Sequence, residues 1–175
     1  MSVTEKVGSW ARTQQQEYSH GEQRPLGGLL TLMGVYGSLT AAGAAAVRAS
    51  GKPLPDRVPL GDALLLTVGT FRLARTIAED PVTSPLRAPF TRFEGASGEA
   101  ELAEEVREHG GWKHAVGELI TCPFCLAQWI GTGFVLSYLA APRATRLAGL
   151  VMTIVAGADV GQFVYDKLQT EVSDS

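Results

Sequence analysis

Residues 26–47 read LGGLLTLMGVYGSLTAAGAAAV, a run of 22 residues without a charged side chain. A helix of that length is about 33 Å long, which is enough to cross a hydrocarbon core of about 30 Å. The many glycines and alanines would make a poor helix in water, but in lipid small residues let helices approach closely. The stretch therefore predicts a transmembrane helix whose small-residue faces pack against partners.

Three further stretches extend this prediction to the rest of the chain. The four predicted spans are residues 26–47, 58–78, 119–141 and 147–164. The second span is unusual because it carries Asp62, Arg72 and Arg75, and we expect it to cross with its charged face turned into the bundle. The predicted fold is all-α: a polytopic membrane protein, built as a bundle of about four transmembrane helices with a cytoplasmic middle segment.

Charged residues gather between and outside the spans. We expect a polar N-terminal tail at residues 1–25, a transmembrane domain at residues 26–165 interrupted by a polar segment at residues 79–118, and a polar C-terminal tail at residues 166–175. Within the polar segment, residues 99–108 carry five acidic side chains and predict a short solvated helix. The net charge of −3 and the lack of a clustered basic face argue against a nucleic-acid partner.

The positions of Lys and Arg predict which way the chain crosses the lipid bilayer. With four spans, both termini and the middle segment lie on one side. That side carries nine Lys and Arg residues, Arg72 excluded, against five on the other, and such an excess is typical of the cytoplasmic side. We therefore expect the termini in the cytoplasm. Cys122 and Cys125 then lie at the cytoplasmic end of the third span, in a reducing compartment.

Two charges inside the predicted spans lie at matching depths. Arg72 in the second span and Asp159 in the fourth are each about six residues, or roughly 9 Å, from the cytoplasmic end. An unpaired charge there costs several kcal/mol, and pairing across helices is the usual remedy. We predict that Arg72 and Asp159 face each other as an intramembrane ion pair; a proton or ion path through them is the functional alternative. Along its own helix, Arg72 also has possible side-chain partners in Thr76 and Asp80, four and eight residues further on.

Both cysteines of the chain lie where the third apolar run begins, and four roles fit Cys122-Pro-Phe-Cys125. A thiol at a helix N-terminus is a good nucleophile, and a second thiol three residues on resolves the mixed disulfide. Two thiolates also supply half of a zinc site, with His109 and His114 as further candidates. Palmitoylation at the membrane boundary is the third role. The fourth is plain packing at the start of a helix, with Pro123 in the first turn.

Three motifs in a fixed order carry a resemblance to a known family. They are Arg72 to Thr76, then Asp80-Pro-Val-Thr-Ser-Pro-Leu-Arg87-Ala-Pro-Phe90, then Gly117-Glu118-Leu-Ile-Thr-Cys122-Pro-Phe-Cys125-Leu with Trp129. Over about residues 60–165 the chain resembles the bacterial membrane family catalogued as domain of unknown function 1360, some members of which carry a sporulation label. The resemblance implies a small integral protein of the bacterial cytoplasmic (inner) membrane, without an established activity. Gln128 departs from the family pattern, which has an apolar residue there.

The motifs also supply candidate site residues. These are Arg75, Asp80, Arg87, Glu118 and Trp129. We expect the segment from Asp80 to Phe90 to pack against the cytoplasmic end of the helix bundle, near the cysteines. In that position Arg87 or Arg92 would pair with Asp80 or Glu118.

Two functions from different classes remain open. The first is a non-enzymatic membrane protein that works by association, docking protein partners or forming a homo-oligomer through its small-residue helix faces and cytoplasmic segment. It needs no cofactor. The second is a thiol-redox or zinc-binding membrane protein, with Cys122 as nucleophile or ligand and Cys125 as resolving thiol or second ligand. A small transporter is a third class, for which few intramembrane polar residues are available.

Overall fold

The computed structural model describes residues 13–14, 17–18, 26–98, 100–107 and 111–173, and the predicted N-terminal tail falls almost wholly outside them. Within these residues the chain is mostly helical and contains one small sheet. The elements are α2 (Leu26–Ala49), α3 (Leu60–Ala78), the 3-10 helix η1 (Pro81–Thr83), α4 (Ser84–Arg87), β1 (Thr91–Gly98), β2 (Glu101–Val106), α5 (Gly111–Ile120), α6 (Pro123–Ala140) and α7 (Pro142–Ser173).

Three of these helices, α2, α6 and α7, are long and apolar enough to cross a membrane. They coincide with the first, third and fourth predicted spans. α3 coincides with the second, but its 19 residues include Asp62, Arg72 and Arg75. Length and composition thus identify three candidate spans, and a fourth depends on how the charges of α3 are accommodated.

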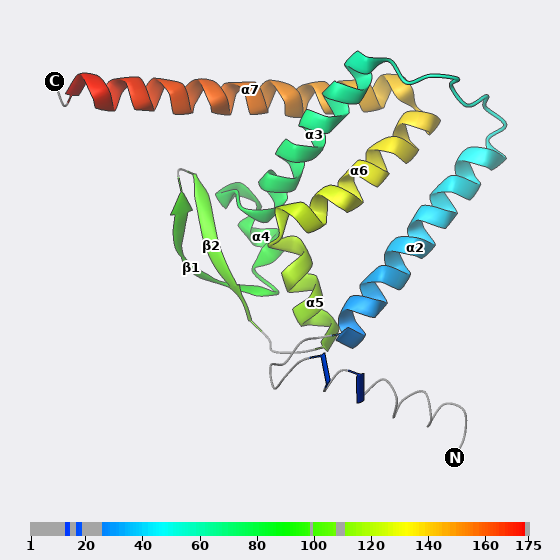
Figure 1. Ribbon diagram of the computed structural model, residues 1–175, viewed down its shortest axis with the longest axis horizontal. Helices are drawn as coiled ribbons and strands as arrows, with labels where there is room; N and C mark the ends of the chain where they lie inside the picture. The colour runs from blue at the N-terminus through cyan, green and yellow to red at the C-terminus, as the bar shows by residue number, and fades with distance from the viewer. Residues whose placement is uncertain (1–12, 15–16, 19–25, 99, 108–110, 174–175) are drawn as a thin grey trace.

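The helices pack around α3, which contacts both α6 and α7, while α2 packs against α5 and α6 (Figure 1). At one end of the molecule, Lys52 Nζ donates a 2.7 Å hydrogen bond to the carbonyl of Ala140, so the end of α2 meets the end of α6. At the same end, Asp62 near the start of α3 pairs with Arg146 near the start of α7. Neighbours α3 and α7 therefore run in the same direction, and the sheet lies at the opposite end of α3.

Small residues let α3 pack closely on both sides. Ala74 and Ala78 of α3 and Leu126 of α6 are buried and form the core between these two helices. On the other side of α3, a Cβ atom placed on Gly69 would lie only 3.3 Å from the Cα of Gly149 in α7. Glycine at both positions permits this close approach of the two backbones.

Residues 91–106 form an antiparallel hairpin, so the short helix predicted at residues 99–108 is wrong and the fold is not all-α. β1 pairs with β2 in a register that places Phe93 opposite Glu104. The turn contains Ala100, which has a φ of 58°. The hairpin forms because of tertiary contacts: Glu101 and Glu104 of β2 bind arginines of other elements. Such contacts override a weak local preference for helix.

One backbone hydrogen bond joins the hairpin to the end of α3, and a second one closes the base of the hairpin. The Leu102 N–H donates to the carbonyl of Glu79 at 3.0 Å, directly after α3. The Arg107 N–H donates to the carbonyl of Phe90 at 2.8 Å, directly before β1. The hairpin is therefore fixed to the end of α3.

α7 is the longest element, with 32 residues and a length of roughly 48 Å. Its C-terminal half extends beyond the other helices (Figure 1). The side chains from Val160 to Ser173 are all exposed. The predicted C-terminal tail at residues 166–175 is helical as far as Ser173, the last described residue.

Candidate functional site

Arg87 is fully buried where α4 meets the hairpin. Its guanidinium binds Glu104 at two points, with Nε 3.0 Å from Oε2 and Nη2 2.8 Å from Oε1. Nη1 also donates to the carbonyl of Ile77 at 2.8 Å and to Thr83 Oγ1 at 2.7 Å. Both Nη1 and Nη2 donate to the carbonyl oxygen of Asp80 at 3.1 Å. A charge this deeply buried is tolerated because every nitrogen of the group has an acceptor.

This geometry corrects the predicted partner of Arg87. The expected acceptor was the carboxylate of Asp80 or Glu118, but the ion pair is with Glu104. Asp80 offers Arg87 only its backbone carbonyl, because its carboxylate is bound by Arg72. The hairpin is what brings Glu104 to Arg87.

Glu104 is held as a carboxylate by several donors. Thr91 Oγ1 donates to its Oε2 at 2.6 Å, in addition to the two bonds from Arg87. Burial by itself would raise the pKa of Glu104, but the hydrogen bonds from Arg87 and Thr91, with the positive charge of Arg87, keep that pKa below its ordinary value. The charged form is therefore the stable one in the folded protein.

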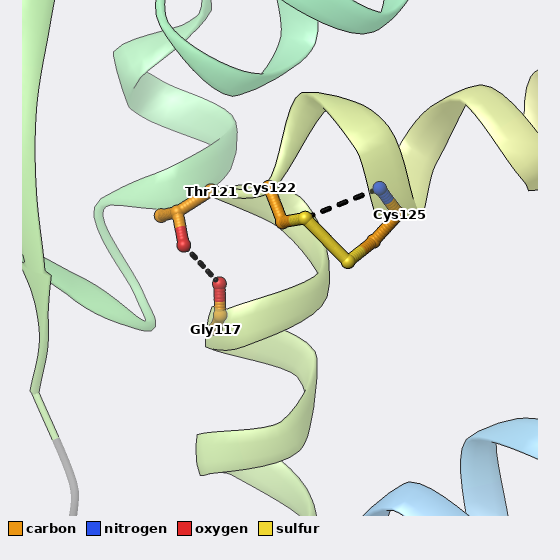
Figure 2. Close-up of a disulfide and its surroundings, with 4 residues drawn as sticks. All are labelled: Gly117, Thr121, Cys122 and Cys125. Carbon is orange, nitrogen blue, oxygen red and sulfur yellow. Dashed lines mark hydrogen bonds between the residues drawn. A yellow bond between two sulfur atoms is a disulfide. The ribbon is translucent and has the colours of Figure 1, made fainter.

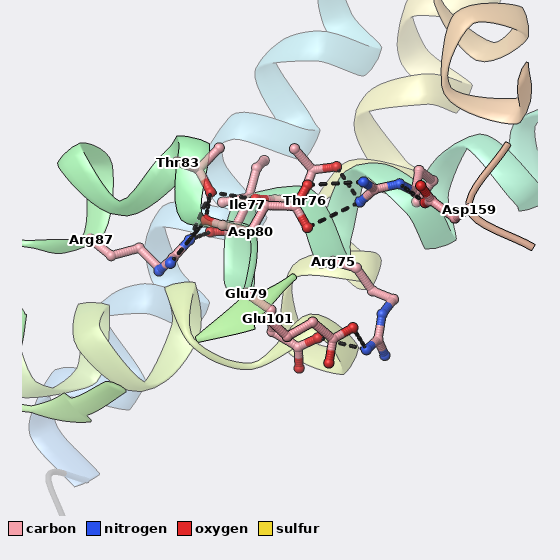
Figure 3. A network of polar contacts seen from close by, with 10 residues as sticks. Arg75, Thr76, Ile77, Glu79, Asp80, Thr83, Arg87, Glu101 and Asp159 are labelled. Atoms are coloured by element: carbon pink, nitrogen blue, oxygen red, sulfur yellow. Dashed lines mark hydrogen bonds and ion pairs between the residues drawn. The ribbon is translucent and has the colours of Figure 1, made fainter. Parts of the chain in front are cut away.

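Arg72 connects α3 to α7. Its Nε lies 2.6 Å from Asp159 Oδ2, so the structure brings the predicted pair together. Along α3, its Nη2 lies 2.9 Å from Asp80 Oδ2, and Nη1 donates to Thr76 Oγ1 at 2.7 Å, in keeping with the predicted i, i+4, i+8 spacing. Figure 3 shows Thr76, Asp80 and Asp159 converging at this point. The Arg72 side chain is 14% exposed.

Arg75, one turn further along α3, has two acidic partners. Its Nη2 lies 2.8 Å from Glu79 Oε2, and it also pairs with Glu101 from the start of β2 (Figure 3). Burial raises the pKa of Glu79 above its ordinary value; Arg75 opposes this effect, and the charges of Glu101 and Asp80 add to it. Arg75 thus fixes the hairpin turn to α3.

A pocket of about 310 Å³ opens between the second half of α3, the hairpin turn and α7. Both arginines of α3 described above line it. Its acidic lining residues are Asp80, Glu101, Asp159 and Asp166. Two cations and four anions give the lining a formal charge of −2. Phe71 and Phe163 add aromatic rings to the wall.

Cys122 and Cys125 form a disulfide at the start of α6 (Figure 2). Cys122 is the N-cap residue of the helix, and its Sγ accepts a 3.1 Å hydrogen bond from the Cys125 N–H. Just before it, Thr121 Oγ1 donates to the carbonyl of Gly117 at 2.9 Å, which closes the end of α5. Cys125 is exposed and Cys122 is half-buried, so the disulfide is open on one side.

The described candidates for zinc ligands, Cys122, Cys125 and His114, are not grouped as a metal site. The described part of the chain holds no group of three or more His, Cys, Asp and Glu side chains placed to bind a metal ion. His114 Nε2 lies 3.4 Å from Oε1 of Glu118, its neighbour one turn along α5. His109 lies outside the described residues. The two sulfur atoms are bonded to each other and are not thiolate ligands in this form.

Trp129 and its neighbours connect α6 to α2. The rings of Trp129 and Tyr36 meet edge to face with centroids 5.1 Å apart. Gln128 Nε2 donates to Tyr36 Oη at 2.8 Å, and Tyr36 Oη also lies 2.7 Å from Thr132 Oγ1. The polar side chain of Gln128, which departs from the family pattern, is therefore satisfied by a partner helix.

A further charged group lies at the opposite end of α3, and sequence reasoning did not assemble it. Arg146 of α7 contacts both carboxylate oxygens of Asp62, with Nη2 at 2.6 Å from Oδ2. Tyr138 of α6 donates to the same oxygen at 2.6 Å. The sequence contains one signal for this group. If the four predicted spans alternate in direction, the starts of the second and fourth spans are expected at the same membrane surface.

Fold and site together define a small, mostly helical protein with membrane-type helices, in which one buried and one partly exposed ion pair hold a polar hairpin to the helices. The chain belongs to a family that matches residues 65–165 and is described as "Protein of unknown function (DUF1360)". This confirms the family resemblance drawn from the three motifs.

The chain is 28% identical over 106 residues to "Sporulation protein YjcA" of Bacillus subtilis (strain 168), a match that covers 53% of this chain and 89% of the relative. No solved structure matches the chain.

Proposed function

We propose that this protein is a multi-pass membrane protein whose four long helices all cross the bilayer, and that it works by association with a partner helix through the outer face of α2. The observation that carries the proposal is a stripe of six small residues along that face. They are Gly27, Thr31, Gly34, Ser38, Ala41 and Ala45.

The geometry of this stripe supports a docking role. Its members recur at intervals of four and three residues, so they share one side of the helix. All six are exposed, whereas Val47, a buried residue of α2, lies on the opposite side of the helix. An atom added as Cβ on Gly34 would meet nothing within 4 Å. Helix faces made of small residues let two transmembrane helices approach closely.

The ion pairs support α3 as the fourth crossing helix. Each of its three charges has a partner of opposite sign: Asp62 pairs with Arg146, Arg72 with Asp159 and Asp80, and Arg75 with Glu79 and Glu101. Paired charges that face other helices are tolerated in a bilayer, and unpaired ones are not. With four spans, the excess of Lys and Arg favours termini on the cytoplasmic side of the bacterial inner membrane.

The association is tested by measuring energy transfer between donor- and acceptor-labelled copies of the full chain in lipid vesicles, at increasing dilution with lipid. For self-association, Gly34→Leu should weaken the interaction by about tenfold, roughly 1.4 kcal/mol, because the added side chain separates the two helix backbones. Gly133→Leu on α6 is the matched control, since Gly133 is equally exposed and equally open.

The two variants give clear outcomes. Loss of energy transfer in Gly34→Leu alone supports self-association through α2. If the native chain associates and both variants associate as it does, the stripe is not the interface. If the native chain shows no energy transfer at any dilution, a homo-oligomer is excluded. The partner must then be a different membrane protein, which crosslinking from a photoreactive residue at position 34 should capture. If that crosslinking captures no other membrane protein, the proposal fails.

A second candidate function is thiol exchange, and the exposed Cys125 in a disulfide is the observation that favours it. Titration of thiols in detergent-purified protein before and after a dithiol reductant, with metal analysis of the reduced form, tests it. One disulfide per chain that cycles reversibly supports the redox form, and about one zinc per reduced chain supports the metal form. Two inert thiols without bound metal exclude both.

A further inference from the structure

We propose that the pocket between α3, the hairpin turn and α7 binds a primary ammonium group. The pocket is separate from the outer face of α2, so this inference does not depend on the proposed association. Its volume of about 310 Å³ is enough for a small organic cation and its attached chain.

The charge of the pocket selects a cation. Its lining carries two more anionic than cationic side chains. The two arginines are already engaged, because Arg72 binds Asp80 and Asp159, and Arg75 binds Glu79 and Glu101. An anionic ligand would therefore meet excess negative charge around these arginines, whereas a cation meets acceptors.

Two carboxylates retain acceptor capacity. Asp166 takes part in no ion pair and no side-chain hydrogen bond within the described part of the chain. Asp159 is bound to Arg72 through Oδ2 only, and its side chain is 33% exposed. The two residues are seven positions apart on α7, on one side of the helix. An –NH₃⁺ group has three donors and can bond to the carboxylate of Asp166, while Asp159, two turns and about 10 Å away along α7, adds negative charge to the pocket.

The remaining wall suits an ammonium better than a metal ion. Phe71 and Phe163 line the pocket and are each more than half exposed. The guanidinium carbon of Arg75 already lies 5.9 Å from the centroid of the Phe71 ring, so a ligand cation gains its cation–π contact at Phe163. The described residues hold no cluster of three acidic or sulfur and nitrogen ligands for a metal. The aromatic rings and apolar Val160 also make room for the hydrocarbon part of the ligand.

The ammonium has two sources that share this chemistry. In the four-span arrangement the pocket lies near one membrane surface, at the level where α3 ends, so the ethanolamine headgroup of a phospholipid reaches it from the bilayer. A soluble primary amine reaches it from the aqueous side. A choline headgroup is the informative comparison, because its quaternary nitrogen has the charge but no N–H to donate.

The test uses the full chain in nanodiscs with equal amounts of phosphatidylethanolamine and phosphatidylcholine of identical acyl chains, with retained lipid counted by native mass spectrometry. We expect phosphatidylethanolamine to be retained about tenfold over phosphatidylcholine, the size of one charge-assisted hydrogen bond. Asp166→Asn should remove the preference. Glu171→Gln, a charge-neutralising change further along α7 and outside the pocket lining, is the matched control and should keep it.

A second arm separates the sources. Free ethylamine is titrated into detergent-purified protein without phosphatidylethanolamine, and binding is measured by calorimetry. Binding that Asp166→Asn weakens about tenfold and Glu171→Gln leaves intact supports the ammonium site with a soluble ligand. Equal retention of the two lipids together with no ethylamine binding overturns the proposal, as does preferential retention of phosphatidylglycerol in a parallel disc or equal effects of the two variants.

Discussion

Arg87 and Arg72 are both paired with carboxylates, but their surroundings differ. Arg87 is fully buried, and backbone carbonyls and hydroxyls satisfy it together with Glu104. Arg72 is bound mainly by the carboxylates of Asp80 and Asp159, and its pairs border an open pocket. The first arrangement fixes the polar segment in one conformation, and the second leaves charge accessible to a ligand. Arg87 therefore has a structural role, whereas the carboxylates around Arg72 border the open pocket.

The largest expected effect is at the buried arginine. Arg87→Met should lower the free energy of unfolding by about 3–5 kcal/mol, because it leaves Glu104 buried without its cation. Thermal or denaturant unfolding of the purified protein in detergent measures this. Arg92→Met is the control: Arg92 is exposed, and its loss should change stability by no more than about 0.5 kcal/mol. Equal losses for the two variants would contradict the structural role of Arg87.

Substitutions in the ion pair between Arg72 of α3 and Asp159 of α7 should lower stability less. Asp159→Asn is expected to lower stability by about 1 kcal/mol, because Asp80 still binds Arg72 and solvent screens the partly exposed carboxylate. The exchange of Arg72→Asp with Asp159→Arg should be better tolerated than either single change. If the double variant is no more stable than the singles in the same unfolding assay, the two residues do not act as a pair.

The smallest expected effects concern pH, and they have opposite signs at two carboxylates. Glu104 has a lowered pKa, so its contribution to stability is present above the unfolded value of 4.5 and is lost as the pH falls through the folded value. Glu79 has a raised pKa, so its charge destabilises the fold at neutral pH, and this penalty disappears as the pH falls towards 4.5.

Two glutamine substitutions separate these effects. Glu104→Gln should be less stable than the native protein at pH 7, and the difference should shrink below pH 4.5. Glu79→Gln should equal or exceed the native protein at pH 7 and lose that advantage in acid. Stability measured from pH 3 to pH 8 checks both, and a shared sign for the two variants would show that the surroundings of the carboxylates are wrongly described.

The difference between the two arginines also explains what the sequence could predict. Arg72 and Asp159 lie in regular helices, so counting residues from the span ends was enough to match their depths. The partner of Arg87 was not accessible in this way, because it lies on β2 of a hairpin that the local sequence pattern does not indicate. The acidic run that supplies Glu104 has no strict alternation and predicts a helix when considered alone.

The cysteine motif shows a second limit of the sequence. The spacing of Cys122 and Cys125 was compatible with thiol, metal, lipid and packing roles, because all four need only two nearby sulfurs at a helix start. The disulfide is a state of oxidation and depends on the compartment. The side of the membrane on which the motif lies is therefore the property that links its chemistry to the topology.

The central claim is that α3 crosses the membrane with its charges paired, and membrane topology tests it most directly. In a chain with Cys122→Ser and Cys125→Ser, single cysteines at Lys52, before α3, and at Ser97, in the hairpin after it, are treated with an impermeant maleimide in intact cells. The account predicts labelling of Lys52→Cys without permeabilisation and of Ser97→Cys only after it. Labelling of both positions from the same side would contradict it, because α3 would then not cross.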